Sequence, residues 1–499
     1  MITQRGADVS GLAERERLER QWAEVRQRFL PAESPHSIWC FDAALRGGLP
    51  RQGWKLHVSA TVLTAADTLV RVAPVLAAFQ AHYKAPRTLT DLAELNAGLT
   101  GDYSQVGKFL TVYPTRDVVA LATALDRATA ELAGPAVPFE PRLRPNSRVS
   151  YRYGVIHTEG DDDPTVLRLP DGSTCADTRE PDTAVPAWAP NPFDLDRAVA
   201  DEPATARADT MTTHPFYAYE AIQQRGKGGT YRALDVGNAP ARRCILKEGR
   251  RHGEVDWCGL DGYDRVHAEA AVLRRLRAAG APVPEVLGSI ELPTHVYVVL
   301  SELAGTDLQT RILTTDTPPM RYRYRLCRDI CAVLACIHAT GLAWRDCKPA
   351  NLVVGDDDGA VAAIDFEGAC DDQDERTSGF GTRLYLPWNW MSRGRGWQCK
   401  DLFSLGITLA QVLTWRFDPD AARPGAVAAD ASGAANRRAT LDRAPSPAET
   451  VDRYRSALAA AGVAPVVCGA IDALWDRDEA ARPAAHAVTA TFAAVATGR

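Results

Sequence analysis

The chain has 499 residues, of which 46% are hydrophobic and 24% charged, and its formal net charge is -6. This composition is typical of a globular protein of two to four domains at about 150 residues each, and excludes a disordered or fibrous chain. The small negative charge argues against a nucleic-acid partner, and no apolar run approaches the roughly 20 residues of a membrane span, so we expect a cytoplasmic protein.

In chain order, residues 8–30 have the pattern of a charged amphipathic helix, and residues 53–61 alternate as a short strand does. Further helices are expected near 63–83 and 115–133, and further strands at 147–157 and 165–170. We therefore predict an α+β domain over residues 1–205. Its end includes an interdomain connection at about 194–213, which is rich in Asp and Ala and lacks apolar periodicity.

A second domain is predicted over residues 214–499. It opens with five strands and one helix, expected at 215–224, 229–235, 242–248, 263–279 (the helix), 284–291 and 295–302. After Gly305 the pattern becomes helical, near 320–340 and 400–415, with three more helices after Glu449 and an exposed loop at 417–447.

Cysteine and lysine usage narrows the kinds of site that can be expected. The eleven cysteines show no C-x-x-C pair and no Cys/His cluster at zinc spacing; Cys327, Cys331 and Cys336 have the helical spacing of buried, reduced thiols. Lysine occurs only seven times among the 57 basic residues, so each lysine is a candidate functional group. Chance survival on the surface best fits Lys400.

The segment W-R-D-C-K-P-A-N at 344–351 has the residues that phosphoryl transfer requires. Asp346 can orient an attacking hydroxyl and accept its proton, Lys348 can stabilise the transferring phosphate, and Asn351 can hold Mg²⁺. Asp365, which opens D-F-E-G, is expected to be the main Mg²⁺ ligand, bridging the nucleotide phosphates.

Upstream, Lys247 ends an apolar strand and Glu269 lies on the following helix, so the two can form a pair that positions the phosphates of ATP or GTP. The loop R-G-K-G-G-T-Y can close backbone N–H groups over those phosphates. Its glycines are Gly226, Gly228 and Gly229. Taken alone, such a loop is usually a simple turn, and Tyr231 stands where G-x-G-x-x-G has its third glycine.

These motifs resemble the eukaryotic-like Ser/Thr protein kinases, which implies an N-lobe at 214–304 and a C-lobe at 305–499. Asp401 and Arg482 fit that family's C-lobe supports. Three features depart from the pattern: Trp344 replaces the histidine of H-R-D, D-F-E-G replaces D-F-G, and G-T-R-L-Y-L-P-W stands where A-P-E closes the activation segment. The departures concern activation-loop control and recognition of a protein substrate, and the catalytic groups are intact.

The first domain gathers positive charge around an acid/base group. W-K-L-H places Lys55 and His57 on the same face of a strand, and Lys84, Lys108 and Arg152 add a phosphate-binding composition. For any single residue, a solvated lysine or a lone strand histidine is the simpler interpretation.

From Trp39 to Phe193 the sequence resembles the phosphothreonine-lyase-like domain of class III and class IV lanthipeptide synthetases, and more distantly the phosphothreonine lyases secreted by pathogenic bacteria. The resemblance rests on G-W-K-L-H-V-S-A-T, Y-K-A-P-R, L-N-A-G-L, G-K-F-L-T-V-Y-P, Y-R-Y-G, L-P-D-G-S and N-P-F.

That resemblance implies a role for each candidate residue. Lys84 is the general base that removes the α-proton of a phosphorylated Ser or Thr, and His57 is the general acid for the departing phosphate. Lys55 stabilises the enolate-like amide oxygen, while Lys108 and Arg152 hold phosphate. Because lysine has a pKa near about 10.4 in water, we hypothesise that neighbouring cations and partial desolvation lower the pKa of Lys84.

Together the resemblances imply a bifunctional kinase and lyase of lanthipeptide (RiPP) biosynthesis. ATP-dependent phosphorylation of Ser or Thr in a ribosomally made precursor peptide with a leader, followed by β-elimination of phosphate, gives dehydroalanine or dehydrobutyrine. The chain ends at Arg499 without the synthetases' cyclase domain. Either a separate cyclase protein closes rings, or the product stays dehydrated, or the chain is truncated.

Two rival interpretations remain open at this point. A signalling Ser/Thr protein kinase with an N-terminal regulatory domain predicts a stable phosphoprotein, and a pseudokinase would only bind a peptide. The complete set of Lys247, Asp346, Asn351 and Asp365 argues against the pseudokinase.

Overall fold

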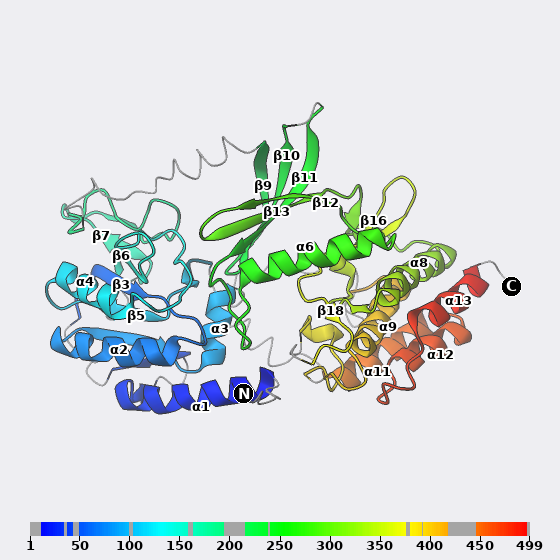
Figure 1. The fold of residues 1–499 in the computed structure, drawn as a ribbon, viewed down its shortest axis with the longest axis horizontal. Coiled ribbons are helices and arrows are strands. Elements are labelled where there is room, and N and C mark those ends of the chain that lie inside the picture. The colour runs from blue at the N-terminus through cyan, green and yellow to red at the C-terminus, as the bar shows by residue number, and fades with distance from the viewer. Residues whose placement is uncertain are drawn as a thin grey trace, which may run out of the picture. The chain divides into compact units, whose positions relative to one another are not determined.

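The computed structural model has a mixed α+β fold and describes residues 11–33, 37–42, 49–98, 103–157, 163–193, 215–237, 240–375, 380–391, 393–417 and 446–496 (Figure 1). The chain divides into two compact units. One comprises Met1–Leu12, Arg265–Ile290 and Val298–Arg499, and the other comprises Ala13–Asp264 and Glu291–Tyr297. The second unit therefore combines the N-terminal domain with the first three strands of the kinase-like domain.

An antiparallel six-stranded sheet organises the N-terminal part, in the order β1-β2-β4-β5-β3-β6. Its strands are β1 (Ala32–Glu33), β2 (Trp39–Phe41), β3 (Gln52–Val58), β4 (His82–Pro86), β5 (Leu110–Tyr113) and β6 (Val149–Val155). The accompanying helices are α1 (Gly11–Phe29), α2 (Ala65–Ala78), α3 (Leu89–Ala97), the 3₁₀ turn η1 (Tyr103–Gln105) and α4 (Val118–Thr129). A separate two-stranded hairpin follows, made of β7 (Val166–Arg168) and β8 (Thr174–Ala176).

One predicted helix was too long. The helix expected near 63–83 ends at Ala78, and residues 82–86 instead form β4 between β2 and β5. Gln80 has φ of 51°, a left-handed conformation that does not continue a helix. Tyr83 and Ala85 are then buried on β4.

The kinase-like part begins with a five-stranded sheet in the order β12-β13-β11-β10-β9, which confirms the predicted strands and helix. Its elements are β9 (Phe216–Arg225), β10 (Gly228–Asp235), β11 (Arg242–Arg250), α6 (Gly262–Ala278), β12 (Val286–Glu291) and β13 (His295–Ser301). Among the described residues no helix is long and apolar enough to cross a membrane.

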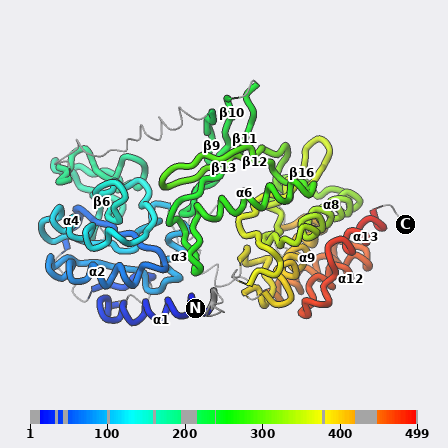
Figure 2. The backbone as a smooth tube through the Cα atoms, viewed as in Figure 1, coloured from blue at the N-terminus to red at the C-terminus, as the bar shows by residue number. Residues whose placement is uncertain are grey.

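Helices dominate the C-terminal part, where α13 packs along α8 and α9 is buried between neighbours (Figure 2). The helices are α7 (Leu308–Thr314), α8 (Met320–Ala339), α9 (Gln398–Thr414), α11 (Pro447–Ala460), α12 (Pro465–Leu474) and α13 (Ala485–Ala496), with 3₁₀ turns η3 (Pro349–Asn351) and η4 (Arg383–Tyr385). Short strands are β14 (Thr306–Asp307), β15 (Leu342–Ala343), β16 (Leu352–Val354), β17 (Val361–Ala363) and β18 (Cys370–Asp371).

Packing in this part decides two of the sequence expectations. Cys327 and Cys331 are buried free thiols in α8, as predicted. The interpretation of Lys400 as a surface residue is wrong, because its side chain is buried on α9 and paired with Glu479. The predicted connection at about 194–213 and residues 418–445 of the predicted loop lie outside the described residues.

Candidate active sites

Strand pairing brings the N-terminal candidates to one face of the six-stranded sheet. Lys84 on β4 and His57 on β3 are both register partners of Thr111, on opposite sides of β5. Lys55 is the partner of Arg152 on β6. Because side chains alternate along a strand and directly paired residues share a face, these four project together.

Glu140 joins this group, although the sequence analysis missed it. Its Oε2 lies 2.6 Å from His57 Nδ1, and its Oε1 lies 2.8 Å from Lys108 Nζ. The Glu140 side chain is only 3% exposed. It follows Phe139 in an irregular segment with no motif, so only the tertiary structure shows that it is the counter-charge of the cluster.

The charges around Glu140 set the ionisation of its partners. Burial would raise the pKa of the Glu140 carboxyl, but His57 and Lys108 lower it to about 2. Burial lowers the pKa of His57 to about 4, so its imidazole is neutral at neutral pH. With its Nδ1 proton donated to Glu140, Nε2 is left to face a substrate.

Both lysines on β3 and β4 also have lowered pKa values. Burial, together with Arg152, lowers the pKa of Lys55 to about 7, and its Nζ donates to Val155 O at 2.7 Å. Burial, together with Arg179 and Lys108, lowers the pKa of Lys84 to about 8. The Lys84 ammonium lies 4.3 Å from the ring centroid of Trp39, a contact that accompanies its desolvation.

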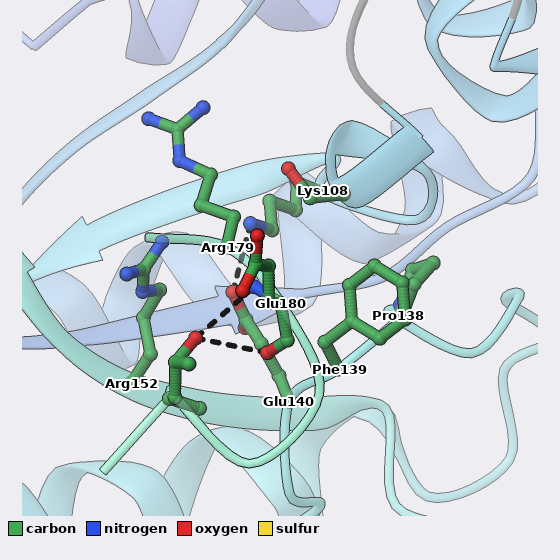
Figure 3. A pocket seen from close by; sticks show the side chains of 10 residues that line it. Lys108, Pro138, Phe139, Glu140, Arg152, Arg179 and Glu180 are labelled. Atoms are coloured by element: carbon green, nitrogen blue, oxygen red, sulfur yellow. Dashed lines mark hydrogen bonds and ion pairs between the residues drawn. The ribbon is translucent and has the colours of Figure 1, made fainter. Parts of the chain in front are cut away.

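A small pocket opens beside this cluster (Figure 3). Lys108, Arg152 and Arg179 line this pocket together with Glu140 and come from three different segments. Arg152 is fixed by Asp177, whose Oδ1 accepts from the guanidinium at 2.5 Å. Arg179 is a further candidate phosphate ligand that the sequence analysis missed, because it follows a short hairpin in no recognisable motif.

The predicted catalytic loop of the kinase-like part is assembled through its own side chains. Lys348 Nζ lies 2.6 Å from Asp346 Oδ2, and the Asn351 amide donates to the same oxygen at 2.9 Å. Thr382, which the sequence analysis did not single out, donates to Asp346 Oδ1 at 2.8 Å and accepts from Lys348 at 2.7 Å. The activation segment therefore contacts both catalytic groups through one hydroxyl.

The tryptophan that replaces the histidine of H-R-D packs against the D-F-E-G segment. The Trp344 indole donates to Asp365 O at 3.1 Å and stacks on Phe366 with ring centroids 5.5 Å apart. Asp401 on α9 accepts from the backbone N–H groups of Trp344 and Arg345, at 2.7 and 2.6 Å, so it holds the catalytic loop as expected. Arg345 has φ of 70°, a strained conformation that these bonds stabilise.

Asn351 and Asp365 have the donor chemistry of a magnesium site. Both hydrogen bonds that Asn351 makes to Asp346 use its amide nitrogen, which leaves the carbonyl oxygen for a metal. Within the described residues there is no cluster of three or more His, Cys, Asp and Glu side chains that could hold a metal alone. The nucleotide phosphates would supply further oxygens.

The remaining nucleotide-site candidates lie on separate elements. Lys247 is on β11, opposite Thr230 of β10, and Glu269 on α6 accepts from the Phe366 N–H at 2.8 Å. Pairing of Lys247 with Glu269 stays a prediction.

Close packing against backbone oxygens requires glycine at two positions of the loop between β9 and β10. A Cβ at Gly228 would lie 1.8 Å from Glu248 O, and one at Gly226 would lie 1.6 Å from Asn96 O. Binding of phosphate by this loop stays a prediction.

Comparison with known families identifies both parts. Residues 219–489 match the protein kinase domain, and residues 21–205 match the family described as RamC, N-terminal domain. Since the kinase match covers more than half of the chain, this protein belongs to the protein kinase family and carries a RamC-type domain before its kinase domain. The resemblance to lanthipeptide synthetases is confirmed at the level of these two domains.

Individual relatives agree with this assignment. The chain is 30% identical to a probable SapB synthase of Streptomyces coelicolor over 69% of its own length and 39% of that protein's. It is 28% identical to the serine/threonine-protein kinase PknA of a Nostoc species, over 39% of this chain and 37% of the relative. The chain thus spans under half the length of these curated relatives.

Proposed function

We propose that this protein is a peptide dehydratase of lanthipeptide biosynthesis, a bifunctional Ser/Thr kinase and phosphoSer/phosphoThr lyase. It phosphorylates Ser or Thr in a ribosomally made precursor peptide and then eliminates the phosphate. The observation that carries the proposal is one sheet face shared by the buried Lys55, His57 and Arg152 and the partly buried Lys84, with buried Lys108 beside them. The same chain holds an ordered kinase catalytic loop.

For phosphorylation, Asp346 orients the peptide hydroxyl and accepts its proton, while Lys348 stabilises the transferring phosphate of ATP or GTP. Lys247 and Glu269 position the nucleotide, and Mg²⁺ held by Asn351 and Asp365 would neutralise phosphate charge. The Thr382 hydroxyl accepts from Lys348 and donates to Asp346, which supports this arrangement because it fixes the two groups relative to each other.

For elimination, neutral Lys84 removes the α-proton, the C–H electrons form the Cα=Cβ bond, and the Cβ–O bond breaks as phosphate leaves. Lys55 stabilises the negative charge on the amide oxygen, and Lys108 and Arg152 hold the phosphate. The bound phosphate dianion raises the pKa of His57, which takes up a proton from water at Nε2 and gives that proton to the departing phosphate. The lowered pKa of Lys84, about 8, supports its role as base.

The proposal also assigns a domain to each reaction and includes a leader, a cellular location and a partner. The lyase domain occupies residues 1–205 and the kinase domain residues 214–499. The substrate carries a leader, the protein acts in the cytoplasm, and a separate cyclase protein is a candidate partner.

Mass spectrometry of candidate precursor peptides with ATP and Mg²⁺ tests the proposal. Phosphoryl transfer and elimination predict intermediates at about +80 Da and products at about -18 Da per residue. Lys84→Ala should accumulate the phosphopeptide, because phosphorylation proceeds without the base. Stable phosphopeptide from the unaltered protein would instead favour a signalling kinase, and normal dehydration by Lys84→Ala would exclude that lysine as base.

A further inference from the structure

The tip of the β9–β10 hairpin, residues 225–228, packs against the RamC-type domain within one compact unit. Gly226 N–H donates to Ala97 O at 3.2 Å, and a Cβ on Gly226 would lie 1.6 Å from Asn96 O. This contact excludes any side chain at position 226, so the glycine serves a contact between the domains as well as any nucleotide.

Asn96 connects the hairpin tip to the segment that carries Lys108. It is 3% exposed, and its amide donates to Ala60 O at 3.0 Å while its carbonyl accepts from Gly107 N at 3.2 Å. Gly107 has φ of 78° and immediately precedes Lys108, so the position of the Lys108 backbone depends on this bond.

Arg250, the last residue of β11, makes a second connection. Its Nε and Nη2 donate to the Glu248 carboxylate at 2.9 and 2.8 Å, and Nη1 donates to Arg225 O at 3.2 Å and to the Tyr103 hydroxyl. The Glu248 side chain is only 2% exposed and is the residue after Lys247. One guanidinium therefore holds the glycine loop, the strand of Lys247 and a tyrosine of the other domain.

Tyr103 in turn contacts Phe139, the residue that precedes Glu140. Its ring meets the ring of Phe139 edge to face, with centroids 5.7 Å apart. Phe139 has φ of 61°, which is costly for a bulky residue and persists only where packing holds it. The next residue is Glu140, which bonds both His57 and Lys108.

We propose that Arg250 and Tyr103 are positioning residues shared by the two active sites, and that nucleotide bound under the glycine loop slows elimination. Phosphates draw the loop toward themselves, Arg250 follows the carbonyl of Arg225, and its bond to Tyr103 weakens. Glu140 then holds His57 and Lys108 less firmly. This inference rests on the proposed lyase function. It would delay elimination until the nucleotide has left the kinase site.

A presynthesised phosphopeptide separates elimination from phosphorylation. The unaltered protein should eliminate phosphate at least about fivefold more slowly with saturating non-hydrolysable ATP analogue, the lower end of usual coupling between two sites. Tyr103→Phe, which removes only the hydroxyl, should eliminate more slowly without analogue at unchanged KM and lose the response. Arg250→Gln should show the same two changes as Tyr103→Phe. Arg251 is an exposed neighbour whose side chain bonds to Pro293 O, so Arg251→Gln should match the unaltered protein.

Hydrogen exchange gives a readout that does not depend on lyase activity. Binding of the analogue should change exchange of the amides at 103–108 and 139–140 in the unaltered protein and in Arg251→Gln, but not in Tyr103→Phe. Elimination by Tyr103→Phe that equals the unaltered rate and still responds to the analogue would overturn the inference and leave the lyase function standing. If the unaltered protein eliminates nothing, the proposed function fails, and the exchange pattern decides the coupling alone.

Discussion

Glu140 is the carboxylate around which the candidate lyase residues are arranged. It orients His57 through Nδ1 and offsets the charge of Lys108, and both partners are almost completely buried with it. A buried cation left without such a counter-charge loses a proton or distorts the site. Glu140 should therefore matter to elimination as much as a residue that touches the substrate.

Replacing Glu140 by Gln tests this role. The amide keeps the shape but removes the negative charge, so we expect elimination from a phosphopeptide to slow about 100-fold, the lower range for a positioned proton-transfer group. Phosphorylation of an unmodified peptide should be unchanged. Glu180→Gln, an exposed carboxylate at the pocket, is the matched control. Equal elimination rates for the two variants would contradict the role.

The lowered pKa values predict that phosphate binding takes up protons. His57 and Lys55 have pKa values near 4 and 7, and a bound dianion raises both. The protein therefore takes up protons when phosphate binds, and its affinity for the phosphate dianion falls as pH rises through about 7, where Lys55 loses its charge in the free protein.

Calorimetry of inorganic phosphate binding in buffers with different ionisation enthalpies measures this uptake. Lys55→Arg should take up fewer protons at pH 7.5, because a guanidinium is already charged there. An affinity that does not change between pH 6 and 9 would show that these groups do not face the bound phosphate.

Among the elements, α9 has the clearest supporting role. Its Asp401 is fully buried and accepts from two backbone N–H groups of the catalytic loop and from His338 at 3.0 Å. The preceding residue, Lys400, pairs with Glu479, so α9 is bonded both to the catalytic loop and to the segment before α13. The helix thus fixes the position of the loop backbone just before Asp346.

Asp401→Asn should destabilise the protein by about 2 kcal/mol, because the new amide group faces a backbone donor and charged hydrogen bonds are lost. Kinase activity should fall together with stability. Urea unfolding measures the change, with Asp329→Asn as control: Asp329 pairs with Arg328 on the surface of α8 and should alter stability by less than about 0.5 kcal/mol. Equal unfolding midpoints would refute the supporting role.

At the scale of the whole molecule, the proposed reactions use separate residues in separate domains. Asp346 acts on the hydroxyl and Lys84 on the α-proton, and none of the residues proposed to act on the substrate takes part in both chemical steps. A phosphopeptide released by one copy of the protein can therefore be processed by another.

Mixing two inactive variants tests this separation. Asp346→Asn should fail on unmodified peptide yet eliminate phosphate from a phosphopeptide, and Lys84→Ala should do the reverse. Together they should restore dehydration, detected as a loss of about 18 Da per residue expected for phosphorylation followed by elimination. Failure of Asp346→Asn on the phosphopeptide would break the two-site hypothesis.

The sequence by itself determined the kinase-like domain and its catalytic loop. Asp346, Lys348 and Asn351 lie within six residues, so local chain geometry alone brings their side chains together, as the observed bonds confirm. The placement of Lys55 and His57 on one face was equally local, because side chains alternate along a strand.

Only the tertiary structure decided which residues complete each site. Lys84 joins His57 because β4 and β3 both pair with β5, and the predicted helix had left no strand at β4. Glu140 and Thr382 come from irregular segments whose sequence carries no periodicity. Periodic patterns fix which side of an element faces inward, whereas the partner across a sheet or loop depends on contacts distant along the chain.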